Sequence, residues 1–235
     1  MSVAALEVAA VSKYYGDFPA LRNVELSFQA GSTVALLGRN GAGKTTLLRI
    51  VAGLSKPTNG QVKILGEDVR KESTRRRIGV LGHGISLYEE LSALENLVLF
   101  AKLYQLENPK KRALAMLERV GLERVSDGLA REFSRGMRQR LAVGRAFLHD
   151  PEVLLLDEPF TALDDRAIAV LQSLLKSMHD RGRTIIMSTH QLREALELAT
   201  HVAMIQRGQI VHQGERTQQM LDDTGWLYRT YGEAA

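Results

Sequence analysis

The sequence predicts an α/β fold built on a mostly parallel sheet. Continuous apolar runs are typical of strands buried on both faces, and they occur at 33–37, 78–81, 153–156 and 184–187. Helical patterns separate several of these runs, which is the rhythm of β-α-β units with parallel strands. Alternating apolar patterns predict two further strands, each buried on one face, at 5–11 and 24–28.

A helix-rich insertion is predicted between two of the buried runs, from residue 91 to residue 149. Ser92 and Glu95 have the spacing of a capping box and predict the start of a first helix. Asn108 and Pro109 provide a cap and a first turn for a second helix, which we expect to end at Gly121.

The rest of the chain contains a third helix, a hairpin and short closing helices. Ser134 is a natural N-cap for the helical pattern at 136–148. Residues 202–211 are expected to form a hairpin with Arg207 and Gly208 in its turn. Short helices follow, and we expect Trp226 to anchor them by packing.

The composition excludes several classes of function. The chain has 235 residues, a net charge of 31 − 27 = +4, 45% hydrophobic residues and no cysteine. Disulfides, thiolate zinc sites, iron–sulfur clusters and cysteine nucleophiles are therefore excluded. The apolar stretches are far shorter than the roughly 18 residues of a transmembrane helix, and the first residues lack the pattern of a signal peptide. Because the small positive excess is scattered, we expect no nucleic-acid partner.

A glycine-rich segment predicts a phosphate-binding loop. Residues 38–45 match G-x-x-x-x-G-K-[ST], between a buried strand and a helical run. Such glycines allow backbone N–H groups to point at phosphate oxygens, which the helix N-terminus also attracts. We expect Lys44 to reach the β- and γ-phosphates and the Thr45 hydroxyl to bind Mg²⁺. The candidate nucleotide-binding residues of this segment are Gly38, Asn40, Gly41, Ala42, Gly43, Lys44, Thr45 and Thr46.

Two acids follow the buried run at 153–156. Asp157 is expected at the carboxyl end of the sheet, where it can hold Mg²⁺ through water. Glu158 can orient or deprotonate the attacking water. An acidic pair at a strand end is usually just solvated, but its combination with a phosphate loop favours the catalytic interpretation.

These segments resemble the nucleotide-binding subunits of ATP-binding-cassette (ABC) transporters. Residues 133–140 stand in the place of the family's signature sequence, residues 161–164 resemble its D-loop, and residues 188–190 resemble the end of the strand that carries the switch histidine. Tyr15 fits the aromatic position that stacks on adenine. Each motif is short, but their order and spacing together cover nearly the whole chain.

The resemblance implies one nucleotide-binding domain over residues 1–235. Its fold would be a P-loop NTPase (RecA-like) core with a β subdomain and a helical subdomain at roughly 86–149. It also implies a head-to-tail homodimer, in which Ser134 and Gly136 of one subunit face the γ-phosphate held by Lys44 of the other. The remaining residues that it places at the site are His190, as a catalytic residue beside the γ-phosphate, and Asp164.

Two positions depart from the family pattern. Arg135 replaces the usual signature glycine, so the signature contacts are expected to be adjusted. His83 stands in the slot of the Q-loop glutamine, which normally links Mg²⁺ and water to the docking surface for the membrane subunit. A Gly-His pair there resembles the ATPase of the haem exporter of cytochrome c biogenesis. A steric substitution in some other exporter is an equal alternative.

The resulting hypothesis is an ATPase subunit that binds ATP and Mg²⁺ and drives a separate membrane permease. We expect it at the cytoplasmic face of the inner membrane, as a peripheral protein. Haem export is the expected task, with haem or cytochrome c maturation components as possible partners. The alternatives are an exporter of drugs, lipids or polysaccharides, and a soluble cassette ATPase that acts, for example, in iron–sulfur assembly.

Overall fold

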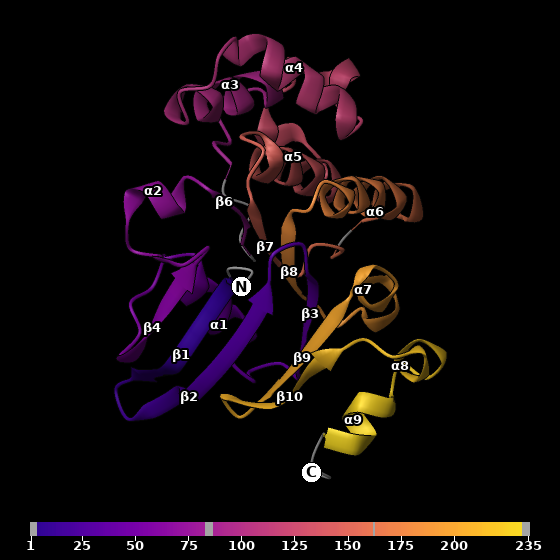
Figure 1. The fold of residues 1–235 in the computed structure, drawn as a ribbon. Coiled ribbons are helices and arrows are strands. Elements are labelled where there is room, and N and C mark those ends of the chain that lie inside the picture. Colours follow the sequence, from indigo (N-terminus) through magenta and orange to yellow (C-terminus); the bar gives the residue numbers. More distant parts are fainter. Residues whose placement is uncertain (1–3, 83–86, 162, 232–235) are drawn as a thin grey trace.

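The computed structural model describes residues 4–82, 87–161 and 163–231, and they form two sheets (Figure 1). The first sheet is antiparallel, in the order β2-β1-β4-β5, with strands β1 Ala4–Tyr15, β2 Phe18–Gln29, β4 Asn59–Ile64 and β5 Glu67–Asp68. The second sheet has the order β10-β9-β3-β8-β7-β6. Its strands are β3 Thr33–Leu37, β6 Ile78–Leu81, β7 Val153–Asp157, β8 Thr184–Ser188, β9 His201–Gln206 and β10 Gln209–Glu215. This architecture confirms the predicted mostly parallel sheet with an added β subdomain.

The second sheet is parallel except for β10, which pairs with β9 in antiparallel orientation. Every residue of β3 is buried, as the continuous apolar run predicts. Alternate side chains of this strand belong to different cores. Val34 and Leu36 join a core with the antiparallel sheet, whereas Ala35 and Leu37 join one with the helices on the opposite face.

Helices cover both faces of the second sheet. α1 Lys44–Val51 packs between the two sheets and contacts β4 and β7. The opposite face is covered by α6 Asp165–Asp180 on β8 and α7 Leu192–Leu198 on β3. The remaining short helices are α2 Glu72–Arg75, α8 Gln218–Asp222 and α9 Trp226–Tyr231, with 3₁₀ turns at Glu123–Val125 and Ala130–Glu132.

The predicted helical insertion forms the upper part of the molecule in Figure 1. It contains α3 Ala93–Leu103, α4 Pro109–Arg119 and α5 Arg135–Phe147. The capping box is confirmed, because the Ser92 hydroxyl accepts from the Glu95 N–H and the Glu95 carboxylate accepts from the Ser92 N–H. α4 ends before Gly121, whose φ of +66° is the left-handed conformation expected after a helix.

The cap of α4 differs from the prediction. Asn108 occupies the N-cap position, but its φ of 50° is left-handed and its side chain makes no capping hydrogen bond. Pro109 at the first helical position needs no N–H partner, which lowers the demand for a side-chain cap.

The expected hairpin at the end of the chain is present as β9 and β10. Arg207 and Gly208 form its turn with φ angles of 47° and 79°, which suits a tight hairpin. Trp226 starts α9 and packs edge-on against Tyr231, as expected of a packing anchor.

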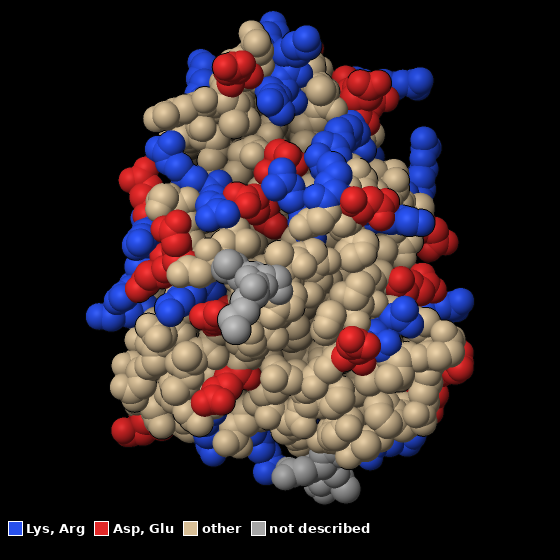
Figure 2. All heavy atoms as spheres, viewed as in Figure 1, with Lys and Arg blue, Asp and Glu red and all other residues tan. Residues whose placement is uncertain are grey.

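Basic and acidic side chains are interspersed over the upper part of the face shown in Figure 2. This mixture agrees with the small, scattered net charge of the sequence. Among the described residues, no helix combines the length and the apolar character needed to cross a membrane.

Candidate nucleotide site

The predicted phosphate loop lies between β3 and α1, where its mechanism requires it. Gly43 is the N-cap of α1 in the left-handed conformation, with a φ of 111°. A Cβ at this position would lie 2.8 Å from the carbonyl oxygen of Ala20, so only glycine fits. The loop therefore ends at a helix N-terminus, which is favourable for phosphate.

A cavity of about 340 Å³ opens over this loop. Its lining residues are Tyr15, Phe18, Ala20, Asn40, Gly41, Gly43, Lys44, Thr45, Thr46 and Glu158. Most of these were predicted from the sequence, whereas Phe18 and Ala20 were missed. The available signal was the tight turn after Tyr15, because the β1–β2 hairpin pairs Tyr15 with Phe18 and so brings the start of β2 to the same edge.

Two exposed aromatic rings stand at the rim of this cavity. The relative exposure of Tyr15 is 53% and that of Phe18 is 64%. The Lys13 ammonium lies 5.1 Å from the centroid of the Tyr15 ring. Exposed aromatic faces beside a phosphate loop suit the stacking of a base.

Lys44 is buried and is held within its own loop. Its Nζ donates to the carbonyl oxygen of Gly38 at 2.7 Å and to that of Arg39 at 3.2 Å. Burial lowers the pKa of Lys44, and the nearby carboxylates of Glu158 and Asp157 oppose this shift. The ammonium group is thus aimed into the loop beside two carboxylates.

Asp157 lies at the carboxyl end of β7 and is 5% exposed. The Ser188 hydroxyl at the end of β8 donates to Asp157 Oδ1, which holds the carboxylate in place. Asp157 and Thr45 also line a second cavity of about 270 Å³ that extends to Gly82. One carboxylate and one hydroxyl beside a phosphate loop suit Mg²⁺, which takes its other ligands from water and phosphate. No cluster of three or more His, Asp or Glu with metal-binding geometry occurs in the described ranges.

Glu158 has an unusual backbone conformation. Its φ is 55°, which is uncommon for a residue with a side chain, and its N–H donates to the Ser188 carbonyl at 2.9 Å. Its Oε2 lies 2.8 Å from Nδ1 of His190 and accepts from the His190 N–H at 3.2 Å. The side chain of Glu158 is 12% exposed and that of His190 is 61% exposed. Strained residues of this kind concentrate at functional sites.

The signature segment lies outside this cavity. Ser134 is the N-cap of α5, and its hydroxyl accepts from the Met137 N–H at 3.2 Å. Ser134 is exposed and Gly136 is partly exposed. In Figure 1, α5 belongs to the upper helices, away from α1. A hydrogen bond connects α5 to the segment next to Glu158, because Gln139 Nε2 donates to the Pro159 carbonyl at 3.2 Å.

Two further residues were predicted at the nucleotide site, Asp164 and His83, and Asp164 does not line the cavity over the phosphate loop. The Asp164 carboxylate caps α6 by accepting from the Ala167 N–H at 2.8 Å. His83 and Ala162 lie outside the described residues, so the prediction for His83 has no structural counterpart here.

Solved structures with this architecture include cassettes of ABC transporters. A dimeric ATP-binding cassette, MJ0796, in a post-hydrolysis state with ADP and Pi has a TM-score of 0.83 at 30% identity, covering 90% of this chain and 99% of that chain. An ATP-binding subunit of an ABC transporter has a TM-score of 0.85 at 31% identity, covering 98% and 95%.

Sequence relatives give the same family. The Nod factor export ATP-binding protein I of Cupriavidus metallidurans is 38% identical over 90% of this chain and 71% of its own length. The daunorubicin resistance ATP-binding protein DrrA3 of Streptomyces coeruleorubidus is 38% identical over 91% and 69%. The sulfate/thiosulfate import ATP-binding protein CysA of Synechococcus elongatus is 39% identical over 87% and 61%. The family model for ABC transporters matches residues 21–161. The chain therefore belongs to the ABC transporter family, as one of its ATP-binding, ATP-hydrolysing subunits.

Proposed function

We propose that the cavity over the phosphate loop binds MgATP and that the acids at its edge direct hydrolysis. The observation that carries this proposal is the convergence of Lys44, Asp157 and Glu158 beside the loop: Lys44 and Glu158 line this cavity, and Asp157 lines the neighbouring one with Thr45. Tyr15 is the stacking platform for the adenine, and the backbone N–H groups from Gly41 to Thr46 surround the phosphates.

Each residue has a defined task in this proposal. Thr45 and Asp157 would hold Mg²⁺, which supplies positive charge to the phosphate oxygens. Glu158 orients the attacking water and accepts its proton. His190 fixes the Glu158 carboxylate through the 2.8 Å contact and is free at its Nε2 to meet the γ-phosphate.

The second half of each site comes from another copy of the chain in this proposal. Ser134 and Gly136 lie at the exposed N-terminus of α5, outside the cavity of their own chain. A head-to-tail homodimer brings that terminus to the γ-phosphate of the partner, and the D-loop at Asp164 lies at the same interface. Residues 1–235 act as one nucleotide-binding domain, with the helical subdomain at roughly 86–149 as an insertion.

The partner that receives the energy is an integral membrane permease. We place the chain at the cytoplasmic face of the inner membrane, as a peripheral subunit. The names of two relatives concern export or drug resistance, and that of a third concerns sulfate import. ATP-binding subunits of this family are therefore associated with several transported compounds. We favour export of an organic molecule.

Haem export with cytochrome c maturation is the narrower version of this proposal. It depends on His83 in the place of the Q-loop glutamine. Purification of the intact membrane complex from its source tests it, because a bound haem has an intense visible absorption band. A complex without that band, but with ATPase activity stimulated by another exported compound, would favour the general exporter.

The general proposal is tested by titrating the purified chain with ADP and ATP, with and without Mg²⁺, and by measuring phosphate release. We expect saturable binding of both nucleotides and hydrolysis that rises with the square of protein concentration at low concentration, because the active species is a dimer. A rate per subunit that is independent of concentration would contradict the shared site.

A further inference from the structure

The closing helix α9 contacts the phosphate loop through one tyrosine. The N–H of Gly38 donates to the Tyr228 hydroxyl oxygen at 3.2 Å, across 190 positions of sequence. Gly38 is the first residue of the phosphate loop, and Tyr228 is partly buried against the core that contains the helices. The contact therefore joins the last helix of the described chain to the base of the nucleotide site.

Gly38 lies where the strand ends and the loop begins. The pairing of β3 with β8 extends to Leu36, and its pairing with β9 extends to Leu37. The N–H of Gly38 is therefore beyond both ladders, yet the residue is buried. A buried backbone N–H needs a partner, and the Tyr228 hydroxyl provides one.

Gly38 cannot be fixed by a side chain of its own. Its φ is +155°, and a Cβ there would lie 2.4 Å from the Ile205 carbonyl oxygen, so the position requires glycine. A glycine backbone has more freedom than that of any other residue. Hydrogen bonds at its N–H and its carbonyl therefore determine how the first peptide of the loop is oriented.

The two hydrogen bonds of Gly38 have partners of different kinds: Lys44 is expected to contact the nucleotide, and Tyr228 is not. The Gly38 carbonyl is held by Lys44, at 2.7 Å. In the proposed complex, the Lys44 ammonium also contacts the phosphates, so its donors are shared between the ligand and this carbonyl. The Gly38 N–H keeps its bond to Tyr228, because that hydroxyl is not needed by the ligand.

The helix that carries Tyr228 is itself well anchored. The Tyr231 ring stacks on His212 of β10 with centroids 4.5 Å apart, and Trp226 packs edge-on against Tyr231. Leu227 is 1% exposed. Burial raises the pKa of Tyr228, and the Glu158 charge acts in the same direction, against the Gly38 hydrogen bond and Arg39. The phenol therefore stays neutral and keeps its role as an acceptor at physiological pH.

We infer that Tyr228 is a positioning residue for nucleotide binding, which holds the base of the phosphate loop in its binding-competent orientation while Lys44 also contacts the phosphates. This inference rests on the proposed nucleotide site. Without the hydroxyl, the loop would populate other orientations, and apparent affinity falls in proportion to the competent fraction.

The test compares Tyr228→Phe with Tyr231→Phe, a matched removal of a hydroxyl three residues further along the same helix that keeps the ring on His212. For Tyr228→Phe, we expect the Kd for ADP and the KM for ATP to rise about 3- to 10-fold, the range produced by losing one hydrogen bond. We expect kcat at saturating ATP to stay within about 2-fold, because the variant still reaches the same bound state. Tyr231→Phe should bind ADP like the wild type.

Hydrogen exchange of the Gly38 amide provides a readout without activity. We expect protection in the wild type, both free and with ADP, and faster exchange in Tyr228→Phe. Unprotected Gly38 in the wild type would overturn the inference even if the variant failed to fold. Equal Kd values for the wild type and a folded Tyr228→Phe would also overturn it, as would a fall in kcat with unchanged affinity. A wild type that binds no nucleotide would instead contradict the proposed function.

Discussion

The phosphate-loop half of the molecule and the signature half differ in how complete they are. At the loop, Lys44, Asp157 and Glu158 already lie together, with opposite charges and internal hydrogen bonds in place. At the N-terminus of α5, Ser134 caps its own helix and faces outward. One half is a preorganised site within a single chain, and the other is an exposed helix N-terminus, suited to an anion, that does not line the cavity of its own chain.

This difference separates binding from hydrolysis. Changes in the loop half should act on the affinity of a single chain for nucleotide or on the chemical step. Changes in the signature half should leave that affinity intact and act only when two chains meet. Single substitutions in each half can therefore tell binding and hydrolysis apart.

Glu158→Gln should reduce hydrolysis by about 100-fold or more while ATP affinity is kept. The amide oxygen can still accept from His190, so the local geometry is retained, but the base is lost. ATP should then trap the dimer, which light scattering would detect as a doubled mass. The double variant with Lys44→Ala should remain monomeric, as a control for nucleotide-dependent association. A monomer at saturating ATP would contradict either the assigned base or the shared site.

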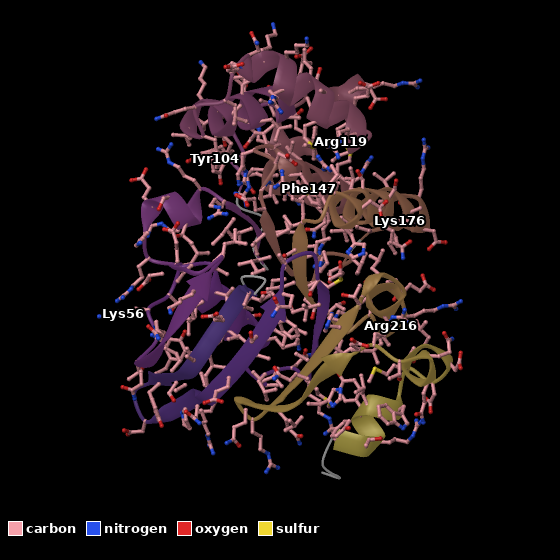
Figure 3. The ribbon with its side chains drawn as sticks, viewed as in Figure 1. Lys56, Tyr104, Arg119, Phe147, Lys176 and Arg216 are labelled. Atoms are coloured by element: carbon pink, nitrogen blue, oxygen red, sulfur yellow. The ribbon has the colours of Figure 1, made fainter. Side chains whose placement is uncertain are left out.

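Lys44→Ala should weaken ATP binding by about 10- to 100-fold, because it removes a charge-assisted contact to the most negative part of the ligand. ADP should lose less, since it lacks the γ-phosphate. Isothermal titration with both nucleotides measures the ratio. Lys56→Ala is a suitable control, because Lys56 lies at the outer edge of the molecule (Figure 3). Identical ATP curves for Lys44→Ala and wild type would exclude Lys44 as the phosphate lysine.

Ser134→Ala should lower the ATPase rate about 10-fold and leave ADP binding by the single chain unchanged. Loss of an N-cap also destabilises the helix by about 1 kcal/mol. Ser92→Ala separates these effects, because Ser92 caps α3 with the same type of hydroxyl hydrogen bond but is not assigned to the nucleotide. Both variants should show similar losses of thermal stability, and only Ser134→Ala should lose rate. An equal loss of rate in both would assign Ser134 a structural role alone.

The sequence was sufficient to predict the central sheet, because β3, β6, β7 and β8 are short apolar runs whose burial on both faces leaves a clear pattern. The antiparallel sheet was harder to predict from the sequence. β4 has the sequence NGQVKI, in which Val62 and Ile64 are its only buried residues, so its alternation is too weak to recognise. Its partner β1 supplies the missing information through pairing, which a local pattern does not contain.

The candidate site shows the same division. Lys44 and Glu158 were predictable because their motifs are local. The left-handed backbone of Glu158 was not, since nothing in the residue types around it requires that conformation. The contact between Tyr228 and Gly38 joins segments 190 positions apart and has no local signal at all.

The smallest predicted effect concerns the junction between the upper helices and the sheet. His149, just after α5, stacks on Tyr104 at the end of α3 with ring centroids 3.9 Å apart, and its Nε2 lies 3.2 Å from the Ile78 carbonyl of β6. Tyr104 is labelled where these helices meet the rest of the molecule in Figure 3. Burial lowers the pKa of His149 to about 4, against a hydrogen bond and Asp150 that oppose the shift.

The unfolded chain binds the His149 proton near pH 6.5, whereas the folded chain binds it only near pH 4. The contribution of His149 to the free energy of unfolding is therefore fully present above about pH 6.5 and is lost as the pH falls toward 4. After allowance for partial solvent exposure, we expect His149 to contribute on the order of 1 kcal/mol to the loss of unfolding free energy between about pH 7 and 5. His149→Phe keeps a stacking ring but does not titrate, so its urea-unfolding free energy should fall less over that range. The test is the slope of unfolding free energy against pH in the two proteins. The lost contact to Ile78 lowers the free energy of the variant equally at every pH and leaves this slope unchanged. Parallel curves for the two proteins would show that protonation of His149 does not destabilise the junction.

The same variant also tests whether the junction acts on the nucleotide site. Because the loop half lies elsewhere, ADP affinity at pH 7 should be the same in both proteins, and this equality would mark the junction as independent of the nucleotide site.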